Sequence, residues 1–125
     1  MNKNTIILVY LLMLVVHVGH VFEEVWGRFW IMNAIYGPGW FLVMNWILFC
    51  IPVSLFYGVL RDKHWAYALS MVYAVLMIFN SAGHNVATLV TGRYWDGFAG
   101  GVTGIGLIPI GLSMLYLLRK EKPAA

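Results

Sequence analysis

The chain is dominated by four apolar segments that only short polar stretches separate. The segments cover about residues 5–22, 41–60, 65–90 and 98–118. Each comes close to the roughly 20 residues that a helix needs to cross the hydrocarbon core of a bilayer. Because unpaired backbone groups are costly in lipid, spanning segments of this kind fold as α-helices. The sequence therefore predicts an all-α fold, an integral membrane bundle of four transmembrane helices in one domain covering residues 1–125.

The composition supports a membrane protein and argues against a soluble one. Hydrophobic residues make up 62% of the 125 residues and charged residues only 10%, which leaves too little polar surface to cover a soluble domain. The net charge of +3 comes from basic residues at the ends of the apolar segments, and no nucleic-acid-binding motif accompanies it. We therefore expect membrane lipids as partners and no nucleic acid.

The stretch between the first two segments, residues 26–40, is too short to span a bilayer and too apolar to lie free in water. It contains Arg28, Asn33 and the turn sequence Tyr36-Gly37-Pro38-Gly39. We expect it to lie along the membrane interface until the Pro-Gly turn directs the chain into the second span.

The distribution of Lys and Arg predicts the orientation of the helices. Six of the eight basic residues fall at the N-terminus, in the loop between the second and third segments, or in the C-terminal tail. Because cytoplasmic loops carry the excess of Lys and Arg, both termini are expected in the cytoplasm of a multi-pass protein of the cell membrane. The first segment lacks the small-residue cleavage site of a signal peptide, so it is expected to remain as a span.

Ionisable residues gather at the end of the first segment, where the sequence reads His17-Val-Gly-His20-Val-Phe-Glu23-Glu24. At about 100° per residue, all four ionisable side chains fall on one face that covers about a third of the helix circumference. Such a face is not accepted by lipid, so it is expected to turn into the bundle.

Two histidines on different predicted helices lie at the same depth. His20 comes 17 residues after Lys3, and His84 comes 19 residues after Trp65 on a helix that runs in the same direction. At 1.5 Å per residue, both lie roughly 25–28 Å from the inner boundary. Asn45 on the second helix reaches a similar level. The sequence therefore predicts a polar site in the outer half of the bundle.

The third segment carries a polar stripe. Asn80, His84, Thr88 and Thr91 follow the spacing i, i+4, i+8 and i+11, which places them along one side of a helix. Asn80 lies one turn from His84, and for that reason we include it as a secondary candidate for the site. Asn45, Asn80 and Thr88 also suit a structural role as interhelical hydrogen bonds.

The acids and histidines of the first segment have structural interpretations as well. Glu23 and Glu24 could mark the outer end of the helix, solvated at the lipid headgroups, and His17 could be a hydrogen-bonded packing residue. His20 and His84 are favoured as functional residues, because they coincide in depth beside carboxylates and ionisable residues within a membrane indicate function by default.

The fourth segment is rich in glycine. Two overlapping Gly-x-x-x-Gly pairs are followed by two further glycines, namely Gly97 with Gly101, Gly100 with Gly104, then Gly106 and Gly111. Small residues at this spacing let helices approach closely, so we expect a packing face, with homo-oligomer formation as one use of it. A groove floored by glycine for a flat apolar ligand is the alternative.

Three of these features together resemble a known family. His20-x-x-Glu23-Glu24, then Tyr36-x-Pro38-Gly39, then a further histidine, His84, stand in the order of the markers of the HXXEE family, small multi-pass and mostly bacterial membrane proteins. The resemblance covers most of the chain. It implies a role for His20, Glu23, Glu24, Tyr36, Pro38, Gly39 and His84. It implies no activity, because the family is defined by its motifs.

Three kinds of function suit these residues. His20, Glu24 and His84, with His17 as a second-tier ligand, could bind zinc or iron and leave a position open for a hydrophobic small-molecule substrate. Alternatively, Glu23 or Glu24 acts as acid or base without a metal: partial removal from water favours the protonated form of a carboxyl, which could donate or shuttle a proton with His84 as its partner, similar in logic to sterol isomerases. The third alternative is a ligand-binding, transport or assembly subunit. Metalloprotease motifs such as HExxH are missing from the sequence.

Overall fold

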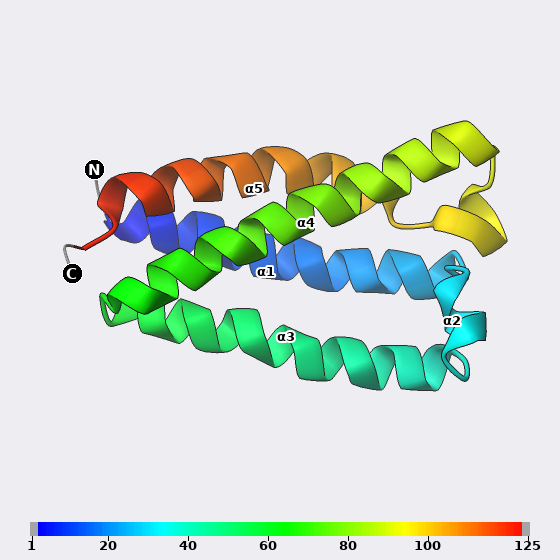
Figure 1. Cartoon of the computed structure of the whole chain (residues 1–125), viewed down its shortest axis with the longest axis horizontal. Helices are drawn as coiled ribbons and strands as arrows, with labels where there is room; N and C mark the ends of the chain where they lie inside the picture. The colour runs from blue at the N-terminus through cyan, green and yellow to red at the C-terminus, as the bar shows by residue number, and fades with distance from the viewer. Residues whose placement is uncertain (1–2, 124–125) are drawn as a thin grey trace.

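The computed structural model describes residues 3–123, which form helices and short connections without any strand (Figure 1). The long helices within these residues are α1 (Lys3–Trp26), α3 (Pro38–Leu60), α4 (His64–Thr91) and α5 (Gly101–Glu121). Two short elements lie between them, α2 (Ile31–Ala34) and the helical turn η1 (Tyr94–Phe98). All four long helices are long and apolar enough to cross a membrane, which confirms the all-α bundle with four helices capable of spanning.

The helix boundaries follow local signals in the sequence. Helix α3 begins at Pro38, whose ring suits the first turn of a helix. Helix α4 ends at Gly92, which adopts the left-handed conformation at φ 65° and donates its N–H to the Thr88 carbonyl. Helix α1 runs four residues past the expected end at Phe22 and stops at Trp26, because both glutamates find partners inside the protein.

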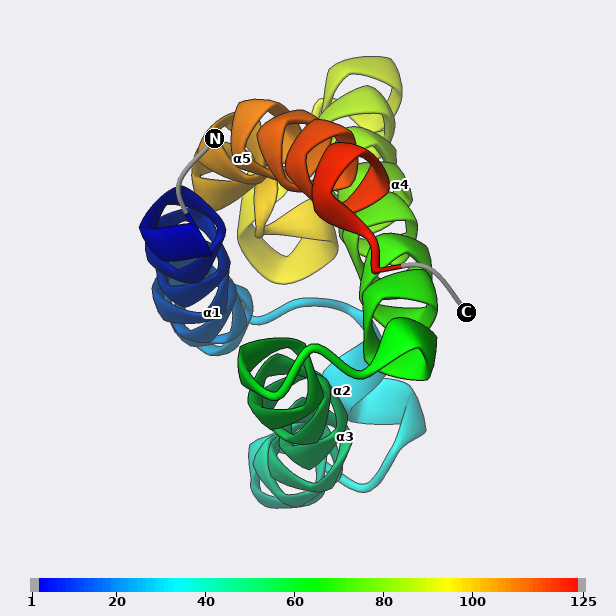
Figure 2. The same cartoon turned by 90° about the vertical axis from the view of Figure 1, so that its left-hand side faces the viewer.

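Viewed end-on, α1, α5 and α4 form an arc, and α3 lies against its open side (Figure 2). The glycines of α5 allow a close approach to α4. A Cβ added at Gly111 would lie 2.7 Å from Ile78 Cγ1, and one at Gly104 would lie 3.2 Å from Ser81 Cβ. The predicted packing face is therefore used within the chain, between α5 and α4. An added Cβ at Gly106 would meet nothing within 4 Å.

Much of the apolar core lies toward the end of the bundle that carries both termini and the α3–α4 loop, where α3 and α4 come together (Figure 1). The Tyr10 hydroxyl donates to the Pro52 carbonyl at 3.1 Å and lies 2.9 Å from Ser70 Oγ, which joins α1, α3 and α4. A Cβ added at Gly58 would lie only 2.5 Å from the Ala66 Cβ. From this contact α3 and α4 diverge toward α2 (Figure 1), and the space between them is where the main cavity lies.

Two connections close the opposite end of the bundle. The backbone N–H of Asp96 donates to the Gly27 carbonyl at 2.8 Å, and the N–H of Trp30 donates to the Gly97 carbonyl at 3.0 Å. An exposed ion pair joins Arg28 Nε to Asp96 Oδ1 at 2.9 Å. These bonds fix η1 over the end of α1, and this in turn fixes where α5 begins.

Candidate metal centre

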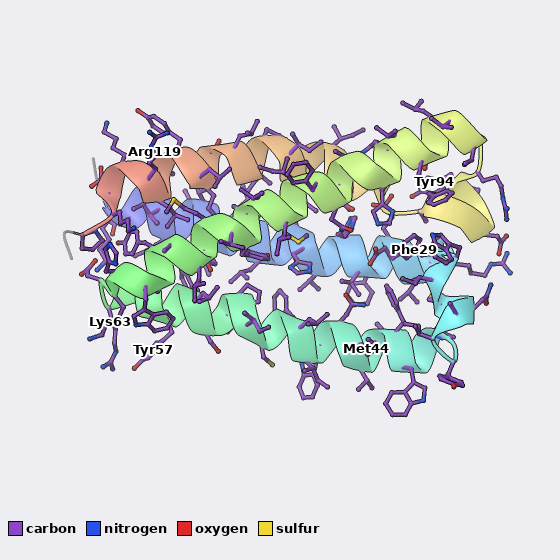
Figure 3. The ribbon with its side chains drawn as sticks, in the orientation of Figure 1. Phe29, Met44, Tyr57, Lys63, Tyr94 and Arg119 are labelled. Carbon is purple, nitrogen blue, oxygen red and sulfur yellow. The ribbon has the colours of Figure 1, made fainter. Side chains whose placement is uncertain are left out.

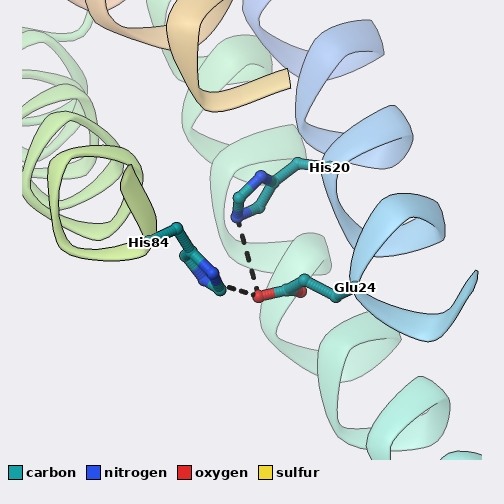
Figure 4. A group of neighbouring side chains, drawn as sticks. All are labelled: His20, Glu24 and His84. Atoms are coloured by element: carbon teal, nitrogen blue, oxygen red, sulfur yellow. Dashed lines mark ion pairs between the residues drawn. The ribbon is translucent and has the colours of Figure 1, made fainter. Parts of the chain in front are cut away.

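Three buried ligand groups meet between α1 and α4 (Figure 4). His20, Glu24 and His84 are 1%, 5% and 4% exposed, and one ligand atom from each lies within 4.8 Å of the other two. His84 Nε2 lies 3.0 Å from Glu24 Oε1, and His20 Nε2 lies 3.6 Å from the same oxygen. We call this group the His20–Glu24–His84 cluster.

The spacing of the sequence accounts for the cluster. His20 and Glu24 are four residues apart, so they lie one above the other on the same face of α1. His84 comes from α4, which has the same direction as α1 and reaches the same level. Phe29 covers the His84 ring at a centroid distance of 4.6 Å, and Figure 3 shows it, with Tyr94, at the α2 end of the bundle.

The Nδ1 atom of His84, which faces away from Glu24, is bonded to the backbone. His84 Nδ1 lies 3.1 Å from the Phe98 carbonyl oxygen, and a carbonyl oxygen can only accept, so Nδ1 carries the proton. In a neutral imidazole this leaves the lone pair on Nε2, the nitrogen that faces Glu24.

The Nδ1 atom of His20 is bonded to a side chain of α5. His20 Nδ1 lies 2.9 Å from Thr103 Oγ1, and the Thr103 hydroxyl donates its own proton to the Glu23 carboxylate. Thr103 Oγ1 therefore accepts from His20 Nδ1–H, and the lone pair of His20 is on Nε2. The Asn80 amide Nδ2, at 2.8 Å, donates to that lone pair. Second-sphere bonds of this kind set the tautomer of metal-binding histidines in proteins.

These bonds leave acceptors facing acceptors inside the cluster. Neutral His84 has a lone pair on Nε2, and the Glu24 carboxylate oxygen 3.0 Å away has no proton to give. Such a pair is stable in a buried site only with a positive charge at the cluster, either a proton or a metal ion. Ligands about 2.0–2.2 Å from a four-coordinate ion lie roughly 3.4 Å apart, which falls between the observed 3.0 and 3.6 Å.

Glu23 does not join the cluster, although the helical angle placed it on the same face. Its carboxylate accepts from the Tyr94 and Thr103 hydroxyls and from the backbone N–H groups of Gly100, Val102 and Thr103, the last three at 3.2, 2.9 and 2.7 Å. A carboxylate is favoured at the N-terminus of a helix, where N–H groups are unpaired. Burial and the Glu23 carboxylate raise the pKa of Tyr94 to about 12. Glu23 thus anchors α5 to α1, and its acid or base role stays a prediction.

Three other predicted residues also lie outside the cluster. His17 Nδ1 pairs with the Tyr73 hydroxyl at 2.8 Å, a turn below His20. Tyr36 is 92% exposed in the turn before α3. Asn45 donates to the Phe41 carbonyl of its own helix at 2.9 Å rather than to a neighbouring helix. Asn80, the second-tier residue of α4, does contact the cluster through His20.

Two cavities reach the cluster. The larger, of about 550 Å³, lies between α1, α3 and α4 and has His20, Glu24 and Asn80 in its wall. The smaller, of about 330 Å³, is open to the surface and has Phe29, Trp30, His84 and Asn80 in its wall. The cluster therefore separates one cavity between the diverging helices from another at the α2 end.

The contribution of residues 98–103 to the cluster was not predicted from the sequence. Thr103, the Phe98 carbonyl and Gly100 all touch the histidines. A threonine in a glycine-rich helix gives no signal of its own, because its role depends on how α5 is rotated against α1. The unusual density of glycine before residue 105 was the one available hint that something packs closely there.

Comparison of the chain with protein-family models, with curated proteins and with solved structures found no significant match. The resemblance of its motifs to the HXXEE family therefore stays a prediction, and the candidate function depends on the geometry of the cluster.

Proposed function

We propose that this chain is an integral membrane protein that binds one divalent transition metal ion at His20, Glu24 and His84 and acts on a lipophilic substrate. The supporting observation is that two imidazole Nε2 atoms and a carboxylate oxygen converge in a buried site while both Nδ1 atoms are held elsewhere. Two histidines and a carboxylate suit zinc or ferrous iron. A bound ion would supply Lewis acidity and an activated water, and it would keep coordination positions open for substrate.

The protein's own residues would prepare this site in three ways. Phe98 and Thr103 fix Nε2 as the nitrogen of each histidine that faces the cluster with its lone pair. A metal ion at His20 Nε2 would displace the hydrogen bond from the Asn80 amide, which would then be beside the ion and able to contact a bound oxygen atom. The apolar wall of the larger cavity admits a lipophilic molecule and limits the access of water.

We place the protein in the cell membrane with both termini in the cytoplasm, following the excess of Lys and Arg at that end. The end that carries α2 and η1 then faces outward, with the exposed aromatic residues Trp26, Trp30, Trp40 and Trp95 at the interface. The segment with α2 would lie along that interface. Any contact with a second copy through α5 would use the open side near Gly106.

A metal-free acid–base reaction is the second candidate. The 3.0 Å separation of His84 Nε2 and Glu24 Oε1 is also the length of a hydrogen bond, so the two groups could share a proton and transfer it to a substrate. A purely structural role for the cluster is less well supported, because cavities adjoin it on two sides. A cluster that only joins helices would be expected to be closely packed.

Metal analysis of the purified protein distinguishes these functions. The wild type would be compared with His20→Ala, Glu24→Ala and His84→Ala after incubation with zinc or ferrous iron and removal of free metal. His17→Ala is the matched control, since it removes a histidine of the same helix that pairs with Tyr73 instead. We expect about one ion per chain in wild type and His17→Ala, and a large loss in the other three. A wild type that binds neither metal would contradict the metal site and leave the acid–base reaction.

A further inference from the structure

The larger cavity is elongated along the bundle axis. On α4 its wall extends from Leu69 to Asn80, a separation of eleven residues, which is roughly 16 Å at 1.5 Å per residue. The hydrocarbon core of a bilayer is about 30 Å thick, so the cavity has the length of one leaflet. It runs in the direction in which the lipid chains of that leaflet would run.

The cavity is polar at one end and apolar at the other. His20, Glu24 and Asn80 stand at the α2 end, whereas Leu55 and Leu69 line the opposite end. The polar groups between these ends include His17 and Tyr73, which bond to each other. A molecule that fits this wall has one polar head and one long apolar tail.

The cavity opens sideways between α3 and α4. Several side chains of its wall are also half or more exposed on the outer surface, including Leu48 and Ile51 of α3 and Leu69, Val72 and Leu76 of α4. In a bilayer this surface faces lipid, so a chain can enter from the membrane without crossing water. The divergence of α3 from α4 provides the opening (Figure 1).

The charge of the cluster indicates the head group. Glu24 contributes one negative charge, and the charge of Glu23 is already compensated by its hydrogen-bond donors on α5. With a divalent ion bound as proposed above, the cluster is left with one net positive charge. A carboxylate balances that charge and supplies an oxygen ligand for an open coordination position.

We infer that the cavity between α1, α3 and α4 binds a long-chain carboxylic acid taken from the bilayer, with its carboxylate at the His20–Glu24–His84 cluster and its tail toward Leu55 and Leu69. The position of the head rests on the proposed metal site, whereas the position of the tail rests on the cavity alone. The acid lies parallel to the lipids of one leaflet.

Binding of tritiated palmitic acid to the protein in phospholipid nanodiscs tests this inference, with empty nanodiscs as the blank. We expect saturable binding that falls at least tenfold in Leu76→Trp, which fills the cavity from a side chain that is 61% exposed and outside the core. Leu112→Trp, at an exposed leucine of α5 away from the cavity, is the matched control and should bind as wild type does. Acetate should not compete, because it lacks the tail.

A second measurement locates the head. The visible absorption of the cobalt-loaded protein should change at the palmitate concentration that half-saturates the site. Removing the metal should weaken palmitate binding relative to hexadecanol, which has the same chain and no charge, because the cluster then lacks the net positive charge that attracts the carboxylate. Equal binding by Leu76→Trp and wild type would overturn the position of the tail. Palmitate binding with no effect on the cobalt spectrum would overturn the position of the head. A protein that takes up no metal would contradict the proposed metal site instead, and the position of the tail would still be tested by Leu76→Trp.

Discussion

Gly100 packs directly against His84: a Cβ added to this glycine would lie 2.8 Å from His84 Nδ1 and 2.8 Å from His20 Cε1. Its backbone φ of 128° is also one that residues with a side chain rarely adopt. We expect Gly100→Ala to displace both rings, to destabilise the protein by about 1–3 kcal/mol and to weaken metal binding. Thermal unfolding in detergent and zinc titration measure the two effects.

Gly106→Ala is the control for that substitution, because an added Cβ there meets nothing within 4 Å. It should leave both zinc affinity and unfolding temperature close to wild type. If Gly100→Ala behaved in the same way, the close approach of residues 98–101 to the histidines would be wrong.

The hydroxyl of Thr103 connects His20 to Glu23, so removing it should weaken metal binding without removing a ligand. In Thr103→Val the imidazole loses the acceptor that fixes its tautomer, and second-sphere losses of this kind reduce affinity about 10–100-fold. Thr103→Ser keeps the hydroxyl and should stay within a few-fold of wild type. Competition with a zinc indicator measures the zinc affinity of each variant. Equal zinc affinities of Thr103→Val and Thr103→Ser would show that the Thr103 hydroxyl has no effect on His20.

Gly83 lines the smaller cavity, and an added Cβ there meets nothing within 4 Å. If water and metal reach His84 through this cavity, Gly83→Leu should slow zinc release to a water-soluble chelator several-fold and leave zinc affinity nearly unchanged. Gly106→Leu adds the same side chain on α5, outside this cavity, and should release zinc at the wild-type rate. An unchanged rate in Gly83→Leu would indicate another route.

The Lys3–Asp62 pair joins the start of α1 to the α3–α4 loop at 2.6 Å, and the Lys3 ammonium also donates to the Leu60 carbonyl at 2.9 Å. The hydrogen bond from Lys3 lowers the pKa of the Asp62 carboxyl below its usual 3.8. Because the carboxyl binds its proton less tightly in the folded state, the contribution to stability is present above about pH 4 and is lost as the pH falls through the lowered value.

Asp62→Asn should therefore lower the unfolding temperature slightly at pH 7, and the difference from wild type should disappear toward pH 2. The effect is small because both side chains are largely exposed. Lys3→Gln should show the same pH dependence. A difference that stayed constant down to pH 2 would mean that the ion pair does not contribute.

The fold was predictable from the sequence because membrane spans leave a simple signal. Each long helix contains an apolar window of the length needed to cross a bilayer. The expected spans differ from the helices mainly at their ends, as where α1 continues to Trp26. Carboxylates near the end of an apolar segment predict the end of the span, whereas Glu23 and Glu24 are bonded within the protein and the helix continues past them.

The cluster was predictable only in part. Spacing of four residues put His20 over Glu24, and equal depth brought His84 to the same level. The helical angles also show His20 between its two acidic neighbours, about 40° from Glu24 and about 60° from Glu23. They do not show which neighbour faces α4 and which faces α5, because that depends on how the helices pack.

The bonds of residues 98–103 also determine when the site can form. Glu24 and both histidines precede residue 98 in the chain, but the groups that fix the two imidazoles come later, the Phe98 carbonyl at the end of η1 and the Thr103 hydroxyl in the first turn of α5. During synthesis, α1, α3 and α4 enter the membrane before α5 is complete, since chains emerge from the N-terminal end. If the cluster binds a metal ion as proposed, the nascent protein has the ligands before their tautomers are fixed, and high-affinity metal uptake is expected only after α5 has packed against α1.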